Sequence, residues 1–171
     1  MTVVLDTSAV LALAIDGPQR LVAEAALASD PVWAASAMAL TEALPAIDRL
    51  SDNRFVRLDL EDAVRRIWDH LHIVPVDQRC LDRAAALART QPVRLTDAIH
   101  LAATERLPEP RRFVTFDPPQ IGVALGLGFD VEEEKVAADF KNGVLTITLT
   151  KSEKAQSKAK RIAINGGAQA Q

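Results

Sequence analysis

The sequence predicts an α/β protein in which a parallel β-sheet is covered by helices on both faces. Short apolar runs rich in β-branched residues are separated by longer segments with the apolar spacing of helices. Strands that alternate with helices imply parallel pairing and helices on each side of the sheet. An apolar content of 49% and a mean hydropathy of +0.06 agree with a folded globular protein.

Five short apolar runs are predicted to be strands. The first is followed by a helical pattern, the turn at Asp30-Pro31 precedes the second, and Asp117-Pro118-Pro119 ends the fourth. The predicted strands are residues 3–5, 32–34, 73–76, 112–116 and 128–131.

Helices are predicted between these strands. The first ends near Ile15, because Asp16-Gly17-Pro18 breaks it, and Ser36 is placed to cap the third. The fourth has an apolar face typical of an amphipathic helix. After the first, the predicted helices span about residues 19–28, 38–47, 60–71, 78–89, 95–107 and 121–125.

The distribution of cations predicts a domain boundary between about Asp130 and Lys135. Residues 1–134 contain thirteen arginines and no lysine, whereas six lysines and a single arginine, Arg161, occur from Lys135 onward. We therefore expect a first domain over residues 1–131 and a different C-terminal segment after it.

Composition also restricts location and partners. The net charge of −3 gives no general attraction to nucleic acid, so such binding needs a local basic patch or metal ions. No apolar run approaches the roughly 18 residues of a membrane span, and the N-terminus lacks a basic signal-peptide region. The one cysteine, Cys80, cannot form an internal disulfide and is expected in the core. We expect a cytoplasmic protein without membrane contact.

Four acidic residues are predicted to meet at one edge of the sheet. Asp6 and Asp117 each follow a strand, Asp97 lies in the first turn of its helix, and Glu42 lies one to two turns into another. The carboxyl ends of parallel strands and the starts of the following helices share an edge, where ligands bind. Clustered carboxylates repel each other unless a cation joins them, and Mg²⁺ or Mn²⁺ prefers such oxygen ligands. Such a site can activate water against a phosphodiester.

Each acid also fits a purely structural role. Asp6 and Asp97 are placed to cap helices, and Asp117 is placed to end a strand. Glu42 lies on or beside an apolar helix face, one turn before Pro45, whose missing N–H can kink the helix and aim the carboxylate.

Other polar residues near these motifs have two interpretations. His100 follows Asp97 on the same helical face and is more simply a packed or capping imidazole than a substrate contact. Two pairs of adjacent arginines are candidate contacts to the phosphates of a nucleic acid, although exposed arginines are ordinary on a solvated face. These pairs are Arg65-Arg66 and Arg111-Arg112.

The motifs that contain the four acids resemble the PIN-domain ribonucleases, and in particular the VapC-type toxins of bacterial toxin–antitoxin pairs. The similar segments are VLDTSA at residues 4–9, the helix with Glu42, LTDAIHLA at residues 95–102, VTFD at residues 114–117 and LGL at residues 125–127. They occur in the family's order and cover about residues 3–131. Pro45 and Pro118-Pro119 depart from the pattern that the family leads one to expect.

The resemblance implies cleavage of single-stranded RNA that depends on Mg²⁺ or Mn²⁺. It implies a homodimer that a partner antitoxin holds inactive. On matching positions it implies that the four acids bind the metal and are catalytic, with Ser8 and Thr115 as polar support. Those acids are Asp6, Glu42, Asp97 and Asp117.

The C-terminal segment resembles part of another family. Residues 136–150 alternate between apolar and polar around Asn142-Gly143, which is a strong hairpin signal. Residues 132–165 are similar to the end of the small heat-shock protein (α-crystallin) domain, including its I-x-I motif at Ile162-Ala163-Ile164. A lone hairpin is marginally stable in water, so it must pack on the first domain, pair with another chain or fray. Residues 166–171 are expected to be disordered.

Three functional hypotheses follow from the sequence. The first is a metal-dependent endoribonuclease. The second is a HAD-type phosphotransferase, which needs a second acid two residues after Asp6, where this chain has Ser8. The third is a non-enzymatic, chaperone-like assembly protein that acts by strand addition through the hairpin.

Overall fold

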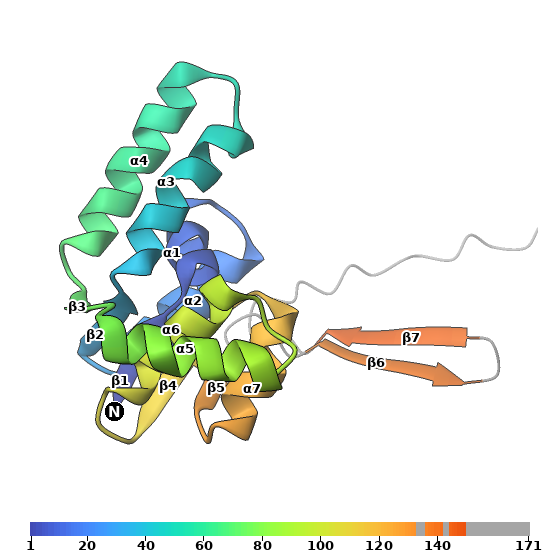
Figure 1. Ribbon diagram of the computed structural model, residues 1–171. Helices are drawn as coiled ribbons and strands as arrows, with labels where there is room; N and C mark the ends of the chain where they lie inside the picture. The colour runs from blue at the N-terminus through green and yellow to red at the C-terminus, as the bar shows by residue number, and fades with distance from the viewer. Residues whose placement is uncertain (133–135, 142–143, 150–171) are drawn as a thin grey trace, which may run out of the picture. The chain divides into compact units, whose positions relative to one another are not determined.

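The computed structural model describes residues 1–132, 136–141 and 144–149. The chain divides into two compact units, Met1–Glu134 and Lys135–Gln171. In the first unit, a five-stranded parallel sheet has the strand order β3-β2-β1-β4-β5, with β1 at its centre (Figure 1). These strands are β1 (Thr2–Leu5), β2 (Val32–Ser36), β3 (His72–Val74), β4 (Arg111–Val114) and β5 (Asp130–Glu132).

Alternating strand residues pack on opposite faces of the sheet. Val4 and Phe113 belong to a core beneath α5, α6 and α7, whereas Val3, Leu5 and Val114 belong to a second core beneath α1 to α4. The helices are α1 (Thr7–Ala14), α2 (Pro18–Ala28), α3 (Met38–Leu50), α4 (Arg54–Trp68), α5 (Gln78–Thr90), α6 (Leu95–Glu105) and α7 (Pro118–Gly126). The predicted α/β class, with both sheet faces covered, is confirmed.

Most predicted boundaries lie within about a turn of the observed ones, whereas the start of the fourth helix and the role of Ser36 were predicted wrongly. Ser36 ends β2 and does not cap α3, whose N-cap, Ala37, makes no side-chain capping bond. The fourth strand ends before Asp117, as predicted, and Pro118 opens α7 slightly earlier than predicted, where its missing N–H costs no helical hydrogen bond. Helix α4 begins at Arg54, earlier than predicted, because Asn53 caps it through the Phe55 amide.

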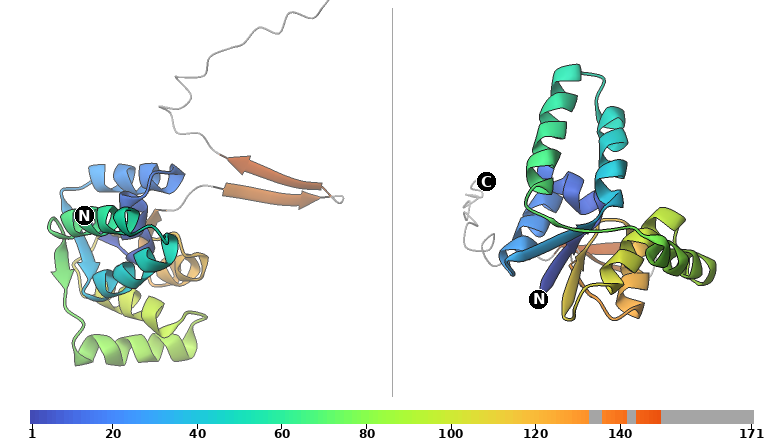
Figure 2. Two further views of the ribbon diagram at one scale, coloured as in Figure 1. Left: turned by 90° about the horizontal axis from the view of Figure 1, so that it is seen from above. Right: turned by 60° about the vertical axis from the view of Figure 1, so that its left-hand side comes forward.

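The helices α3 and α4 form an antiparallel pair that extends beyond the sheet, as the right-hand view of Figure 2 shows. The far end of this pair carries Phe55, whose side chain is exposed. The near end of α3 contacts α6, at the edge of the sheet where the strands end (Figure 1). Helix α3 therefore runs from the edge of the sheet where the strands end to the end of the helix pair that carries the exposed Phe55.

The sheet order creates a switch point between β1 and β4. The chain moves from β1 to β2 and β3 on one side, and then returns to β4 and β5 on the other. Helices that follow β1 and β4 therefore leave on opposite faces and open a crevice at the carboxyl edge, which is where ligands bind in such sheets. Asp6 follows β1 and Asp117 lies three residues after β4.

In the second unit, β6 (Val136–Lys141) pairs with β7 (Val144–Leu149) in an antiparallel hairpin, as predicted. The predicted Asn142-Gly143 turn, the Ile162-Ala163-Ile164 motif and the predicted disorder of residues 166–171 lie outside the described residues. No helix among the described residues is long and apolar enough to cross a membrane.

Candidate active site

All four predicted acids line one pocket of about 210 Å³ at the carboxyl edge of the sheet. They come from four different places in the chain and meet near the switch point between β1 and β4. The pocket is lined by Asp6, Thr7, Ser8, Leu11, Glu42, Ala46, Arg49, Arg94, Asp97, His100, Asp117 and Gln120.

Asp6 is buried at the centre of a set of hydrogen-bond donors. Its Oδ1 accepts hydrogen bonds from the Ser8 hydroxyl at 2.7 Å and the Ala9 amide at 2.8 Å. Its Oδ2 accepts from the Thr115 hydroxyl at 2.7 Å and the Gln120 side-chain amide at 3.0 Å. The Ala9 contact makes Asp6 the N-cap of α1, so the capping role expected from the sequence is present alongside the pocket position.

Burial raises the pKa of Asp6 above its ordinary value. Positive charge at His100 and hydrogen bonds from Ser8, Ala9 and Thr115 act in the opposite direction, because they favour the carboxylate. A cation in the pocket would also favour the ionised form. The site therefore holds a carboxylate whose charge is incompletely compensated by the protein.

Ser8 and Thr115, predicted as polar support, connect Asp6 to the end of β4. The Phe116 amide donates to Ser8 Oγ at 2.8 Å, and the Asp117 amide donates to Thr115 Oγ1 at 3.1 Å. Each hydroxyl therefore donates to Asp6 and accepts from the backbone just after β4. This arrangement sets the position of the Asp117 backbone relative to the Asp6 carboxylate.

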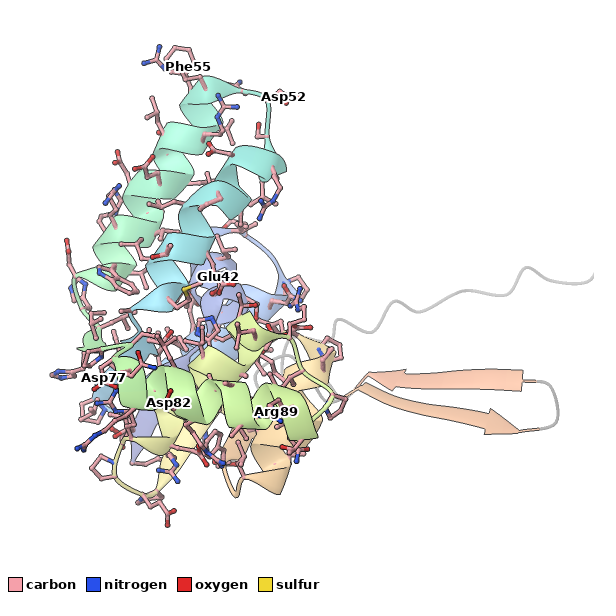
Figure 3. All side chains as sticks on the ribbon, in the orientation of Figure 1. Glu42, Asp52, Phe55, Asp77, Asp82 and Arg89 are labelled. Atoms are coloured by element: carbon pink, nitrogen blue, oxygen red, sulfur yellow. The ribbon has the colours of Figure 1, made fainter. Side chains whose placement is uncertain are left out.

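Glu42 lies in the part of α3 next to α6 (Figure 3). Its Oε2 accepts from the Thr7 hydroxyl at 2.6 Å and pairs with His100 Nε2 at 2.7 Å. These hydrogen bonds, first of all the one from His100, lower the pKa of Glu42 despite its partial burial. Because α3 and α6 cover opposite faces of the sheet, this pair joins the two layers at the site edge.

His100 is almost completely buried, as the packed interpretation of this residue predicted. Nε2 must carry a proton, since the Glu42 carboxylate can only accept, and the same N–H is 3.1 Å from Thr7 Oγ1. Nδ1 is 2.8 Å from Ser36 Oγ, a hydroxyl that can accept from a charged ring or donate to a neutral one. Ser36 therefore orients the imidazole instead of capping a helix.

Asp97 and Asp117 share one cation, Arg94. Arg94 Nε donates to Asp97 Oδ2 at 2.8 Å, and Nη2 donates both to Asp97 Oδ1 at 3.0 Å and to Asp117 Oδ2 at 2.7 Å. The Arg94 backbone amide also donates to Asp97 Oδ2 at 3.2 Å, which satisfies one free N–H at the start of α6. Asp97 therefore has the structural role that was expected at the start of its helix, and it also lines the pocket.

The arginines that line the pocket are Arg49 and Arg94, not the predicted arginine pairs. Arg65 pairs with Glu61 on α4, and Arg66 lines a different pocket. Arg111 and Arg112 begin β4, at the amino end of the strand and thus at the opposite edge of the sheet. Arg111 donates to backbone carbonyls there, and Arg112 pairs with Asp130.

The chemistry of the pocket suits a hard divalent cation. Its four carboxylates are the ligand type that Mg²⁺ and Mn²⁺ prefer. Gln120 also lines this pocket, and its buried Oε1 has no hydrogen-bond partner among the described residues. Such an orphaned oxygen suits a metal-bound water. Within the described ranges, however, no three His, Cys, Asp or Glu side chains are grouped so that they could hold a metal directly.

Sequence reasoning did not identify Thr7, Arg94 or Gln120 as site residues. Thr7 stands between Asp6 and Ser8, so its position in the motif was a usable signal. Arg94 precedes Asp97 by three residues, a spacing at which an ion pair is common in helices. Gln120 had no such signal, because its contact with Asp6 spans 114 positions.

Two family models match consecutive parts of the chain, and they meet at a different point from the two compact units. A family model described as the PIN domain matches residues 3–121, and one described as the Hsp20/alpha crystallin family matches residues 122–165. The second match begins inside α7, which packs in the first unit together with β5. A search of curated protein sequences gave no significant match.

Solved structures share the fold of the first unit at low sequence identity. FitAcB from Neisseria gonorrhoeae has a TM-score of 0.59 and 17% identity, covering 77% of this chain and 96% of that one. VapC20 from Mycobacterium tuberculosis, described as a sarcin-ricin loop cleaving toxin, has a TM-score of 0.58 and 19% identity over 77% and 99%. A toxin–antitoxin complex from Klebsiella pneumoniae has a TM-score of 0.53 and 21% identity over 67% and 86%.

The lowered pKa of Glu42 predicts a specific pH dependence of stability. A carboxyl group with a depressed folded-state pKa stabilises the fold above its ordinary pKa of 4.5, and this contribution is lost as the pH falls through the folded value. Urea unfolding of metal-free wild type and Glu42→Gln from pH 7 to pH 3 should show wild type more stable at neutral pH, with the difference shrinking below about pH 4.5. A difference that stays constant over this range would contradict the assignment.

Proposed function

The chain belongs to the PIN domain family, and on this premise we propose that it is a metal-dependent endoribonuclease that cleaves single-stranded RNA. The observation that carries the proposal is the meeting of four carboxylates in one pocket at the switch point of the sheet. A fold alone does not determine chemistry, whereas a pocket lined by four carboxylates supports metal-assisted hydrolysis. The description of VapC20, which has the same fold, as a sarcin-ricin loop cleaving toxin supports RNA as the substrate.

The residues that would hold the metal are Asp6, Glu42, Asp97 and Asp117. When bound, Mg²⁺ or Mn²⁺ would supply an activated water and stabilise negative charge on the phosphate. The protein's own contribution is to fix the carboxylates before the metal arrives. Ser8, Thr115 and Gln120 orient Asp6 through hydrogen bonds, and His100 with Thr7 orients Glu42.

The substrate's phosphates need cations close to this acidic pocket. Arg49 and Arg94 line it, and both have exposed side chains that can reach a ligand. Contacts from arginine to phosphate fix the position of a nucleic acid without reading its sequence. With a net charge of −3, the protein depends on such local contacts to hold RNA.

We also propose that the protein is the toxin of a toxin–antitoxin pair, acts in the cytoplasm and forms a homodimer. Toxin–antitoxin complexes among the structures with this fold support an antitoxin partner. A second pocket of about 520 Å³ between α1, α2 and α4 offers that partner an apolar surface, with Leu13, Trp33 and Ile67, and charged groups at Arg20 and Glu24.

Light scattering of the purified protein should give twice the chain mass of 18.5 kDa, and a monomer mass would contradict the homodimer.

The nuclease proposal predicts the effect of Asp97→Asn. Asp97 is the third residue of α6, and an asparagine there keeps a side-chain oxygen that can accept from the Arg94 backbone amide, so the start of α6 should be retained. Losing a metal-binding charge should reduce Mn²⁺-dependent cleavage of single-stranded RNA by at least about 100-fold, the upper end of the losses seen when outer-shell partners of a metal are removed. The measurement is a cleavage assay with Mn²⁺ and with excess EDTA, in which wild type should be active only with metal.

Asp77→Asn is the matched control. Asp77, labelled in Figure 3, also caps a helix, α5, and also pairs with an arginine, Arg106, but it does not line the acidic pocket. This variant should retain cleavage close to the wild-type rate. Cleavage that survives EDTA, or equal losses in both variants, would contradict a metal-dependent site at Asp97.

A further inference from the structure

Arg94 occupies the position in which a cation would join Asp97 and Asp117. Its Nη2 donates to one oxygen of each carboxylate, at 3.0 Å and 2.7 Å, and its Nε holds the second Asp97 oxygen at 2.8 Å. Both Asp97 oxygens are therefore engaged by the same guanidinium. We propose that Arg94 is a built-in competitor of the metal, which holds these two acids in the metal-free protein and must release them before a divalent cation binds.

The charges of the pocket make the two states mutually exclusive. A guanidinium neutralises only one of the two carboxylates that it contacts, whereas a divalent cation neutralises both. Two cations at hydrogen-bonding distance from the same oxygens would repel each other. An oxygen that bonds a metal also loses much of its capacity to accept from Nη2. Metal binding therefore requires the Arg94 head group to leave, and this inference rests on the proposed metal-dependent function.

The three side chains differ in their freedom to move. The Arg94 side chain is 74% exposed, whereas those of Asp97 and Asp117 are 5% and 23% exposed. Asp97 is also held at the start of α6 by its bond with the Arg94 backbone amide, which does not require the guanidinium. The long, exposed arginine can rotate into solvent while the acids stay in place. Release therefore needs only side-chain motion.

Removing Arg94 should consequently tighten metal binding. When only a fraction of the protein is in the state that can bind a ligand, the apparent Kd equals the intrinsic Kd divided by that fraction. Such minor states are commonly 0.1–10% populated. Calorimetric titration of Mn²⁺ into the full chain should therefore show at least about tenfold tighter binding for Arg94→Met than for wild type. In EDTA the variant should melt below wild type, since the repulsion between Asp97 and Asp117 is no longer offset.

Two further variants separate competition from general charge effects. Arg49→Met removes the other arginine that lines the pocket, for which no hydrogen bond to the four acids is found among the described residues. It should tighten Mn²⁺ binding clearly less than Arg94→Met. Arg94→Lys keeps the charge but lacks the planar fork that reaches both carboxylates, so its affinity should lie between those of wild type and Arg94→Met.

The possible results have different consequences. Equal or weaker Mn²⁺ binding by Arg94→Met, with cleavage still dependent on metal, would overturn the competition and leave the proposed function intact. Equal gains from Arg49→Met and Arg94→Met would also overturn it, because a general reduction of positive charge would then explain both. Absence of Mn²⁺ binding in all variants, together with cleavage in EDTA, would overturn the proposed function and the competition with it.

Discussion

Mutual repulsion among four carboxylates is the constraint on which the rest of this site depends. The pocket gathers them at one sheet edge, and the protein offsets their charge in three separate ways. Asp6 receives neutral donors and keeps a raised pKa, Glu42 is paired with His100 and keeps a lowered one, and Asp97 and Asp117 share Arg94. The acids are thus held in place before any metal is bound. They differ in how much of the negative charge of each carboxylate the protein leaves available to a ligand.

The sheet makes this convergence possible. Because β1 and β4 are neighbours at a switch point, the residues that follow them lie side by side, and the starts of helices on both faces reach the same edge. The hydrogen bond between Glu42 and His100 then ties α3 to α6 across that edge. Apolar packing on the two faces holds the strands, and the polar network holds the site. Burial of a charged cluster is tolerated because nearly every buried oxygen has a donor.

The sequence predicted those features that depend on local order. Asp6 and Asp117 were placed at the carboxyl edge because each follows an apolar run, and a strand's direction decides which end faces the site. The same rule of strand direction places Arg111 and Arg112 at the edge of the sheet opposite to the acidic pocket, because they begin β4. Their contacts to phosphates stay a prediction. The partnership of Glu42 and His100 spans 58 positions, and that of Ser36 and His100 spans 64. No local pattern encodes such pairs, so Ser36 was assigned to a helix cap.

Anomalous diffraction from crystals grown with Mn²⁺ tests the central claim most directly, because it locates the metal without relying on activity. A metal-dependent site predicts a manganese peak in the acidic pocket, within bonding distance of carboxylate oxygens from the set Asp6, Glu42, Asp97 and Asp117. It also predicts that the Arg94 guanidinium has left Asp97 and Asp117. A pocket without manganese, with Arg94 still bound to both acids at Mn²⁺ concentrations that support RNA cleavage in solution, would contradict the account.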